Sequence, residues 1–373
     1  MTKIVFIGRG NAGVFGALHF SYHSDAEVEL IYDPNTPPEK VGQASLLEAP
    51  DLLWRCFGLN WYDNPIEATP KLGIVYENWG KSKKHFIHPF EFSSTGIQYN
   101  PEQLQDYILK NGKFKVTKKN VEPHDIDADY VFDCRGKLPN EDKEYDFLKS
   151  PLNSVILGQG QSADPKQNWT RAVATPDGWT FVIPNANNTT SYGYLYNDKC
   201  TSDKAAVKNF SSIFNLAIQN FHLNQKVQGF KFKSYLAKKP IRDNVFLSGN
   251  RLFFLEPLES TAVQSYLAWY RMCFDLIFNQ HEAGSITKSF KEYIHQVENF
   301  ILWHYQFGSR YKTKFWKEAR KFKIRCPKFK KYVDYCKKNS SDYVRDNRLD
   351  FNTSLYGQHA PRSFKNWLDN VKK

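Results

Sequence analysis

Long apolar runs, a signal-peptide pattern and paired cysteines are all missing from this chain of 373 residues. No apolar run reaches the roughly 18 residues that a membrane-spanning helix needs, so we expect no membrane partner. The chain enters a strand-like segment at Lys3, which is not how a secretory signal begins. Its six cysteines include no C-x-x-C pair, which argues against a zinc site and a disulfide framework. These absences predict a cytoplasmic protein without a metal centre.

Aromatic and basic residues, by contrast, are abundant. Aromatics make up 16% and charged residues 24% of the chain, which is typical of a globular protein with one composite or two ordinary domains. The net charge of +12 is uneven, because residues 310–338 are rich in lysine and arginine with aromatics between them. Such a surface can bind nucleic acid. A solvated helical face explains it better, since no nucleic-acid-binding motif accompanies it.

The first 33 residues have the pattern of a dinucleotide-binding βαβ unit. Glycines in the turn of such a unit let the backbone approach a pyrophosphate, which lies on the helix N-terminus. Asp33 follows the second strand and can accept a hydrogen bond from a ribose hydroxyl. The expected parts are a strand at 3–7, the turn G-R-G-N-A-G at 8–13, a helix at 14–23 and a strand at 28–32.

Later segments return to this nucleotide-binding unit. Residues 129–136 and 245–249 each have the pattern of a strand closing on a glycine, and the region 152–240 between them is rich in strands. This alternation favours an α/β (α+β) fold of the flavin-monooxygenase type over a dehydrogenase with two consecutive domains. The expected division is a core at 1–290 and a helical C-terminal region at 291–373, with FAD-binding segments at about 1–60, 115–150 and 240–290 and a substrate-binding sheet at about 61–114 and 151–239.

Residues 253–262, F-F-L-E-P-L-E-S-T-A, form the most informative stretch. They predict a strand end and a polar turn, followed by a helix from Val263 to about Asn279. Polar groups there lie beside unpaired helix N–H groups, so an anion or a charged reaction centre can be held. The other expected elements are strands at 72–76, 84–92, 179–184 and 191–196, and helices at 99–110, 290–305 and 313–324.

Several of these segments together resemble the flavin-dependent halogenases of the tryptophan-halogenase type. The turn is similar to their Glu-Pro-Leu-Glu-Ser-Thr-Gly run, and the similarity covers most of residues 1–320. Short halogenases of viral, particularly cyanophage, type resemble the chain most, which would place it in the cytoplasm of a host cell. The other matching segments are V-G-Q-A-S at 41–45, the strand K-L-G-I-V-Y-E-N-W at 71–79, H-P-F at 88–90, W-T-F-V-I-P at 179–184, and H-Y with F-W at 304–305 and 315–316.

The resemblance implies that FADH2 from a separate flavin reductase, O2 and a halide (bromide, iodide or chloride) generate hypohalous acid. Lys71 would hold this species or become a haloamine, Glu259 would orient it and take the ring proton, and Ser260 would orient Glu259 or the substrate. Thr261 and Ala262 would offer backbone N–H groups to halide. The substrate would be an electron-rich aromatic small molecule. Composition alone gives plainer readings: a surface lysine, a helix N-terminal carboxylate and a helix cap.

The resemblance also assigns residues to the flavin. Trp179 and Phe181 would fill space beside it and keep the organic substrate away, although ordinary aromatic core is the other reading. Glu256 precedes a proline and fits a structural role. His88 and His304 have no visible partner in the sequence, so we expect satisfied core or surface histidines. The expected flavin-binding residues are Gly8, Gly10, Ala12, Gly13, Asp33, Gln43, Ala44, Gly249, Asn250 and Val263.

Three positions depart from the family pattern: Gln43 replaces a glutamate, Phe181 a tryptophan, and Ala262 a glycine. Alanine has narrower backbone limits than glycine, so we expect a slightly altered halide pocket. The C-terminal part is shorter, so the lid over free tryptophan is expected to be missing or reshaped. The alternatives are a flavin-dependent monooxygenase or NAD(P)H oxidoreductase on the same fold, and a binding protein without catalysis. No pattern indicates an oligomeric state.

Overall fold

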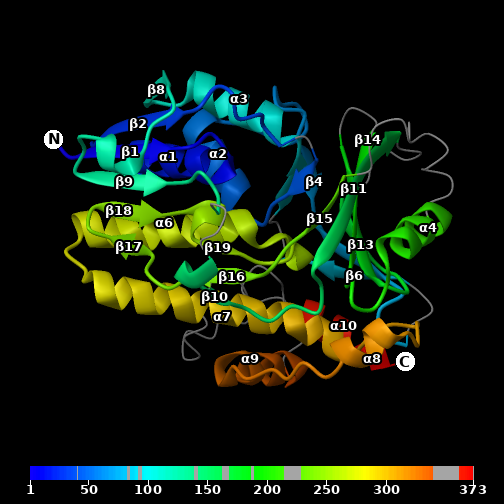
Figure 1. Ribbon diagram of the computed structural model, residues 1–373. Helices are drawn as coiled ribbons and strands as arrows, with labels where there is room; N and C mark the ends of the chain where they lie inside the picture. The colour runs from blue at the N-terminus through cyan, green and yellow to red at the C-terminus, as the bar shows by residue number, and fades with distance from the viewer. Residues whose placement is uncertain are drawn as a thin grey trace.

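The computed structural model describes residues 1–39, 41–81, 85–90, 95–137, 142–161, 168–185, 189–213, 228–338 and 361–372. A parallel sheet and a larger mixed sheet lie side by side, with helices packed around both (Figure 1). The N-terminus lies beside the parallel sheet, and the C-terminus lies at the opposite end of the molecule. The arrangement confirms the expected α/β (α+β) class.

The six-stranded sheet has the order β17-β18-β9-β1-β2-β8. Its neighbouring strands are parallel except for β17 and β18. Three distant stretches of the chain build it because each supplies a short apolar strand that is buried against its neighbours. The bounds are β1 Lys3–Ile7, β2 Glu27–Tyr32, β8 Lys115–Lys118, β9 Tyr130–Asp133, β17 Ile241–Arg242 and β18 Val245–Leu247.

Helices α1 (Asn11–His23) and α6 (Ala262–Phe278) pack against each other and against this sheet. Phe6 of β1 stacks on Phe132 of β9 at 4.6 Å, and the ring of Tyr270 from α6 meets both. The remaining helices near this sheet are α2 Glu48–Phe57 and α3 Pro101–Asn111.

The expected helix at 99–110 is wrong at its start, because α3 begins at Pro101. The Asn100 side chain accepts hydrogen bonds from the backbone N–H groups of Glu102 and Gln103, and proline suits the first helical position. Tyr99 therefore stays in the preceding strand, β7.

The seven-stranded sheet has the order β15-β11-β14-β13-β12-β5-β6 and is antiparallel except between β12 and β5. Two three-stranded sheets, β3-β7-β4 and β10-β16-β19, connect the large ones. Residues 84, 91 and 92 of the expected strand at 84–92 lie outside the described residues. The bounds are β3 Gln43–Ala44, β4 Thr69–Lys71, β5 Gly73–Glu77, β6 Phe86–Pro89, β7 Gly96–Tyr99, β10 Tyr145–Phe147, β11 Ser154–Gln161, β12 Thr170–Ala174, β13 Gly178–Pro184, β14 Thr189–Tyr196, β15 Gln228–Lys231, β16 Tyr235–Ala237 and β19 Phe253–Phe254.

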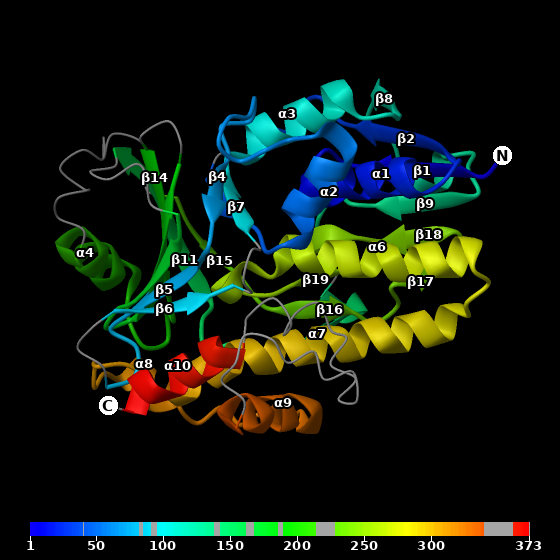
Figure 2. The same cartoon turned by 180° about the vertical axis from the view of Figure 1, so that it is seen from behind.

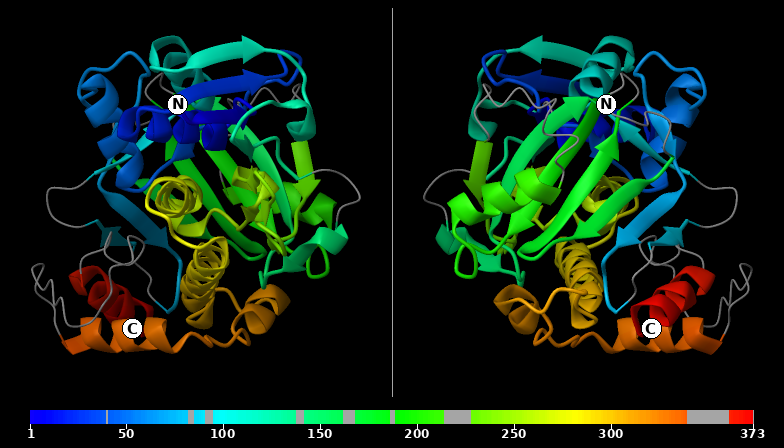
Figure 3. Two further views of the ribbon diagram at one scale, coloured as in Figure 1. Left: turned by 90° about the vertical axis from the view of Figure 1, so that its left-hand side faces the viewer. Right: turned by 90° about the vertical axis from the view of Figure 1, so that its right-hand side faces the viewer.

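The C-terminal helices lie at the end of the molecule opposite the parallel sheet, where α10 packs on α9 and β6 (Figures 2 and 3). The expected helix at 313–324 is too long, because α8 ends at Ala319. The Asn299 side chain accepts from the backbone N–H groups of Arg325 and Cys326, which holds the chain non-helical before Pro327. The bounds are α4 Asp203–Ile213, α7 Ala283–Gln306, α8 Lys314–Ala319, α9 Pro327–Lys338 and α10 Pro361–Lys372.

Four short 3₁₀ turns complete the described elements. Within the part of the chain that the structure describes, no helix combines the length and the apolar character needed to cross a bilayer. All six cysteines are free thiols. The turns are η1 Pro123–Asp125, η2 Asp142–Glu144, η3 Gly249–Arg251 and η4 Leu258–Ser260.

Candidate active site

The glycine-rich turn leads from β1 into α1. The Gly8 N–H donates to the Ile31 carbonyl at 2.8 Å, and a Cβ on Gly13 would lie only 1.8 Å from the Gly8 oxygen. Gly8 also has a φ of 115°, which other residues rarely adopt, so the fold itself needs both glycines. Gly10 is different, because a Cβ there would meet nothing within 4 Å. Helix α1 starts beside it without a side-chain cap, which leaves its first N–H groups available to an anion.

Other expected flavin-binding residues gather at this end of the sheet. Asp33 follows β2, and its carboxylate accepts from the Asn35 N–H at 2.9 Å. A Cβ on Gly249 would lie 2.5 Å from that of Ala12, so η3 sits directly on the start of α1. The exposed Asn250 next to it accepts from the Tyr266 hydroxyl at 3.1 Å. The arrangement leaves Gly10 as the open part of the turn.

Gln43 and Ala44 form β3, and the structure gives a reason for glutamine at position 43. Its Oε1 accepts from the Asn11 amide at 2.6 Å, while its Nε2 donates to the Glu39 carboxyl. A glutamate at position 43 would lose the donor and place a second carboxyl against Glu39, so the amide suits this network better.

Trp179 and Phe181 lie two residues apart on β13 and so project from the same face. Their ring centroids are 6.3 Å apart. The Phe181 ring occupies the space over Gly193, where an added Cβ would fall 2.1 Å from it. Val263, in the first turn of α6, is buried. The pair forms a packed aromatic surface at the centre of the large sheet.

Lys71 lies where the chain passes from one sheet to another. We expected it at the head of the 72–76 strand, but it is the last residue of β4, in the small sheet, while β5 starts at Gly73 in the large one. A Cβ on Gly73 would come within 2.5 Å of the His88 carbonyl oxygen, so only glycine allows the two strands to approach here. Lys71 therefore projects from the junction of two sheets.

The Lys71 side chain is fully buried and not on the surface. Its ammonium donates to Ser260 Oγ at 2.8 Å and lies 5.4 Å from the centre of the Phe90 ring. Burial lowers the pKa of the Lys71 amine to about 7, although the charge of nearby Glu259 opposes the shift. Lys71 is therefore balanced between a cationic hydrogen-bond donor and a neutral nucleophilic amine near neutral pH.

Glu259 is also buried, with only 2% of its surface exposed. Its backbone adopts φ 71° and ψ 5° within η4, a left-handed conformation that non-glycine residues rarely adopt. The Tyr76 hydroxyl donates to its Oε1. Burial and the neighbouring Glu259 raise the pKa of Tyr76 well above its ordinary value, so this hydroxyl remains a donor.

Two histidines with no visible partner in the sequence, His88 and His304, both contact this carboxylate, and both are buried, as expected of core histidines. His88 Nδ1 lies 3.2 Å and His304 Nε2 lies 2.8 Å from Glu259 Oε1. They come from β6 and from the end of α7, more than 200 residues apart. No local pattern joins them to Glu259, and the matched H-P-F and H-Y segments were the only signal available.

Neither Ser260 nor Thr261 caps α6 with its side chain. Ser260 instead adopts φ 55° and accepts from Lys71. Ala262 is the first residue of α6, a position that alanine accepts without difficulty, so the expected alteration at this position has no backbone cause. The positive φ values fall at Glu259 and Ser260 instead. Thr261 and Ala262 begin α6, whose first N–H groups have no side-chain cap.

Glu256, the other carboxyl of the turn, has a different environment. It accepts from the Tyr305 hydroxyl at 2.7 Å and from the Ser150 hydroxyl at 3.4 Å, and it is almost fully buried. Burial raises the pKa of Glu256 to about 8. It is therefore mostly a neutral acid near neutral pH, which fits the expected structural role.

His88, Glu259 and His304 offer donor atoms that all lie within 4.8 Å of one another, a spacing that a metal ion could use. The Tyr76 hydroxyl reaches the same Glu259 oxygen as both rings. Tyr76 is a hydrogen-bond donor to this oxygen, whereas each ring nitrogen can donate to it only in the form that carries hydrogen on that nitrogen.

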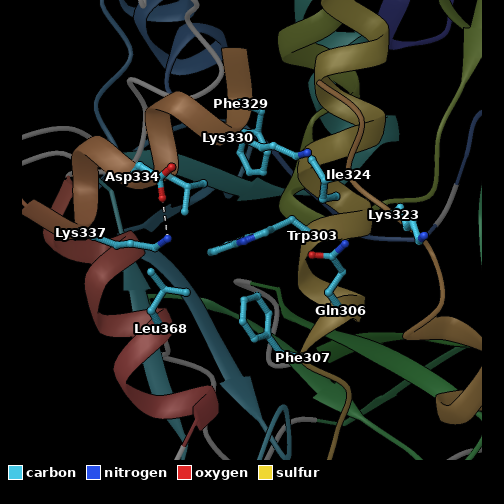
Figure 4. A pocket seen from close by; sticks show the side chains of 11 residues that line it. Trp303, Gln306, Phe307, Lys323, Ile324, Phe329, Lys330, Asp334, Lys337 and Leu368 are labelled. Atoms are coloured by element: carbon cyan, nitrogen blue, oxygen red, sulfur yellow. Dashed lines mark hydrogen bonds and ion pairs between the residues drawn. The ribbon is translucent and has the colours of Figure 1, made fainter. Parts of the chain in front are cut away.

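A groove of about 540 Å³ lies behind this cluster, between α7, α9 and α10 (Figure 4). Trp303 forms part of its wall, whereas the next residue, His304, faces Glu259. Neither Lys71 nor Glu259 lines the groove, so it is separate from the buried lysine–carboxylate site. Its described lining is Trp303, Gln306, Phe307, Lys323, Ile324, Phe329, Lys330, Val333, Asp334, Lys337 and Leu368.

The parallel sheet with its glycine-rich turn, the mixed sheet beside it, and the buried Lys71 and Glu259 make up an α/β architecture of the dinucleotide-binding kind with one buried candidate site. The sequence profile described as tryptophan halogenase matches residues 3–123 and 113–372. The chain therefore belongs to the tryptophan halogenase family, and it is a flavin-dependent halogenase of aromatic substrates.

Solved structures of halogenases share the fold. A tryptophan 6-halogenase from Streptomyces toxytricini has a TM-score of 0.77 at 17% identity over 100% of this chain and 90% of its own. A tryptophan halogenase from Shewanella frigidimarina has a TM-score of 0.77 at 16% identity over 100% and 89%. A flavin-dependent halogenase from Brevundimonas has a TM-score of 0.75 at 17% identity over 99% and 90%.

Proposed function

We propose that Lys71 and Glu259 carry out the halogen transfer, with hypohalous acid as the halogen donor and an electron-rich aromatic small molecule as the acceptor. The observation that supports this most is the hydrogen bond of 2.8 Å between Lys71 Nζ and Ser260 Oγ, which joins the buried amine to the residue beside Glu259. Two reactive side chains from distant segments thus meet in one water-poor site. There their hydrogen bonds and charges act more strongly than in water.

The overall exchange is ArH + HOX → ArX + H2O. Lys71 holds the oxidised halogen, either as hydrogen-bonded hypohalous acid or as a haloamine, and its pKa of about 7 suits both roles. The ring forms its bond to the halogen, and the C–H electron pair then returns to the ring as Glu259 takes the proton. The hydroxide released from HOX becomes water with one proton from the site. Ser260 fixes Lys71 in this proposal.

The flavin would be FAD, reduced to FADH2 by a separate flavin reductase, and with O2 it would supply the oxidant that converts halide to hypohalous acid. Gly10 and the uncapped start of α1 fit its pyrophosphate, because added bulk at Gly10 meets no protein atom. The other proposed contacts are Gly8, Ala12, Gly13, Asp33, Gln43, Ala44, Gly249, Asn250 and Val263. Bromide, iodide or chloride would bind at the N–H groups of Thr261 and Ala262, at the positive end of α6.

The remaining assignments belong to the same proposal. Trp179 and Phe181 shield the flavin side of the site, and the chain divides into a flavin-monooxygenase-like core at 1–290 and a helical region at 291–373. The chain works in the cytoplasm, and it resembles short viral, cyanophage-type halogenases. The basic residues at 310–338 form a solvated surface and not a nucleic-acid-binding face.

The test is a product assay with FAD, a flavin reductase, NADH, O2, bromide and a panel of phenols and indoles, read by mass spectrometry. Lys71→Ala and Glu259→Gln should abolish the brominated product. Glu256→Gln is the matched control, because it makes the same exchange in the same turn at a carboxyl that is already mostly neutral. It should keep at least about half of the activity.

Product that survives in both Lys71→Ala and Glu259→Gln would contradict the proposed roles and would point to leaked hypohalite. Oxygenated product without halogen would favour a monooxygenase instead. Rapid bleaching of bound FAD by NADH alone, without the reductase, in a stopped-flow experiment would contradict the need for a separate reductase.

A further inference from the structure

The Glu259 carboxylate is buried and therefore needs a compensating charge. A buried ionised carboxylate without a partner is strongly unfavourable, so it either binds a proton or pairs with a cation. Lys71 has its own hydrogen-bond partner in Ser260 and is only about half charged near pH 7. His304 lies closer, with its Nε2 at 2.8 Å from Glu259 Oε1.

The backbone of α7 determines which nitrogen of His304 carries a hydrogen. Its Nδ1 lies 2.8 Å from the Phe300 carbonyl oxygen, one helical turn earlier. A carbonyl oxygen only accepts, so Nδ1 must be protonated. The neutral ring would then present the lone pair of Nε2 to Glu259 Oε1 at 2.8 Å, which is repulsive when both atoms lack a proton. A proton on one of the two partners removes this repulsion, and a proton on Nε2 makes the contact an ion pair.

The other neighbours of Glu259 decide which partner holds that proton. Oε1 also accepts from the Tyr76 hydroxyl, and His88 Nδ1 lies 3.2 Å from it. Several donors on one carboxyl oxygen favour the ionised form of the acid. We propose that His304 is held as an imidazolium and is the resident counter-ion that keeps Glu259 ionised and in place. This rests on the catalytic role proposed for Glu259, and it makes His304 a positioning residue.

The rings around His304 suit a buried cation. Tyr76 of β5 stacks on it at 5.5 Å with an interplanar angle of 14°, and Trp367 of α10 meets it edge-on at 4.6 Å. The Phe300 ring lies 4.9 Å away. Aromatic neighbours at these distances stabilise a positive charge. The titratable groups facing His304 are Glu259 from η4, Tyr76 from β5 and His88 from β6, with Lys71 of β4 beyond Glu259.

This arrangement has a consequence for Lys71. Because His304 balances the charge of Glu259, Lys71 need not remain an ammonium to do so. The amine can lose its proton near pH 7 and react as a nucleophile while Glu259 stays ionised as the base. Glu259 can therefore stay ionised whether or not Lys71 carries a proton.

The first test is nuclear magnetic resonance on the full chain labelled with ¹⁵N-histidine. There are ten histidines, and His304→Gln identifies the His304 signals. Between pH 6 and 9 the wild-type ring should show both nitrogens protonated, and in Glu259→Gln it should become neutral. A neutral His304 ring in the wild-type protein at pH 7 would overturn the proposal. This readout needs no substrate, so it separates the failure of this inference from a failure of the proposed reaction.

The second test is the pH profile of bromination. His304→Gln keeps a hydrogen-bond donor but cannot carry the charge, so Glu259 should bind a proton at higher pH. We expect at least about a tenfold loss of rate at pH 7 and an acid limb moved up by about one to three pH units. Tyr76→Phe removes a neutral donor and should move the limb less. An unmoved limb in a folded His304→Gln variant would overturn the proposal.

Discussion

Glu259 and Ser260 share an uncommon backbone conformation. Both have positive φ values, 71° and 55°, although neither is glycine. A left-handed conformation costs an ordinary residue about 1–2 kcal/mol. It turns the chain so that Glu259 contacts Tyr76, His88 and His304 while Ser260 accepts from Lys71. Strain of this kind persists where the surroundings fix the conformation, often at reactive sites.

Two substitutions of Ser260 separate strain from hydrogen bonding. Both Ser260→Ala and Ser260→Gly remove the hydroxyl that binds Lys71, but only glycine relieves the positive φ. We expect Ser260→Gly to be about 1 kcal/mol more stable than Ser260→Ala in urea unfolding. Both variants should lose activity relative to the wild type. An alanine variant as stable as the glycine variant would show that the left-handed conformation is not costly here.

The glycine-rich turn between β1 and α1 allows two glycine-to-alanine variants to be compared. A Cβ on Gly13 would lie 1.8 Å from the Gly8 oxygen, so Gly13→Ala should destabilise the protein by several kcal/mol, on the order of 3. Gly10→Ala meets no protein atom and should leave the unfolding free energy of the FAD-free protein within about 0.5 kcal/mol.

The FAD affinity of Gly10→Ala should nevertheless fall by at least about tenfold, because the methyl group occupies the space proposed for the pyrophosphate. Thermal unfolding gives the first quantity and fluorescence titration with FAD gives the second. Unchanged FAD affinity in Gly10→Ala would place the pyrophosphate elsewhere.

Stability of the whole molecule should depend on pH through two buried ionisable groups. The pKa of Lys71 falls from 10.5 to about 7, so between these values the unfolded chain binds more protons and stability rises with pH. The pKa of Glu256 rises from 4.5 to about 8, so between these values the folded chain binds more protons and stability falls as pH rises. Between about pH 7 and 8 the two opposite slopes of stability against pH cancel. In this range the two pKa shifts together lower the unfolding free energy most.

The double variant Lys71→Met/Glu256→Gln removes both effects. Its unfolding free energy should exceed that of the wild type most at about pH 7–8. At pH 5 and at pH 10 this gain should be smaller by roughly 2–3 kcal/mol, because each pKa unit corresponds to about 1.4 kcal/mol. Urea unfolding at the three pH values measures this difference. Leu72→Met, at a half-exposed neighbour, controls for the added methionine. A gain that does not vary with pH would contradict the two pKa shifts.

The α/β class, the βαβ start and the family resemblance of the polar turn could be predicted from the amino-acid sequence. These follow from local periodicity and from motifs of a few neighbouring residues, such as the glycines at 8–13 and the run at 256–261. Element ends that depend on one side chain were predicted less well: Asn100 moves the start of α3, and Asn299 fixes the non-helical stretch after α8.

The contacts within the candidate site, by contrast, depend on how distant segments pack together. The site joins residues up to 228 positions apart (76 to 304). Lys71 is buried where the chain changes sheets at Gly73. The left-handed turn at Glu259 brings its carboxylate oxygen to Tyr76, His88 and His304. A sequence pattern records spacing along the chain, whereas charge balance in a buried site depends on distance in space. His88 and His304 therefore looked like isolated histidines in the sequence, and in the fold they are the neighbours of Glu259.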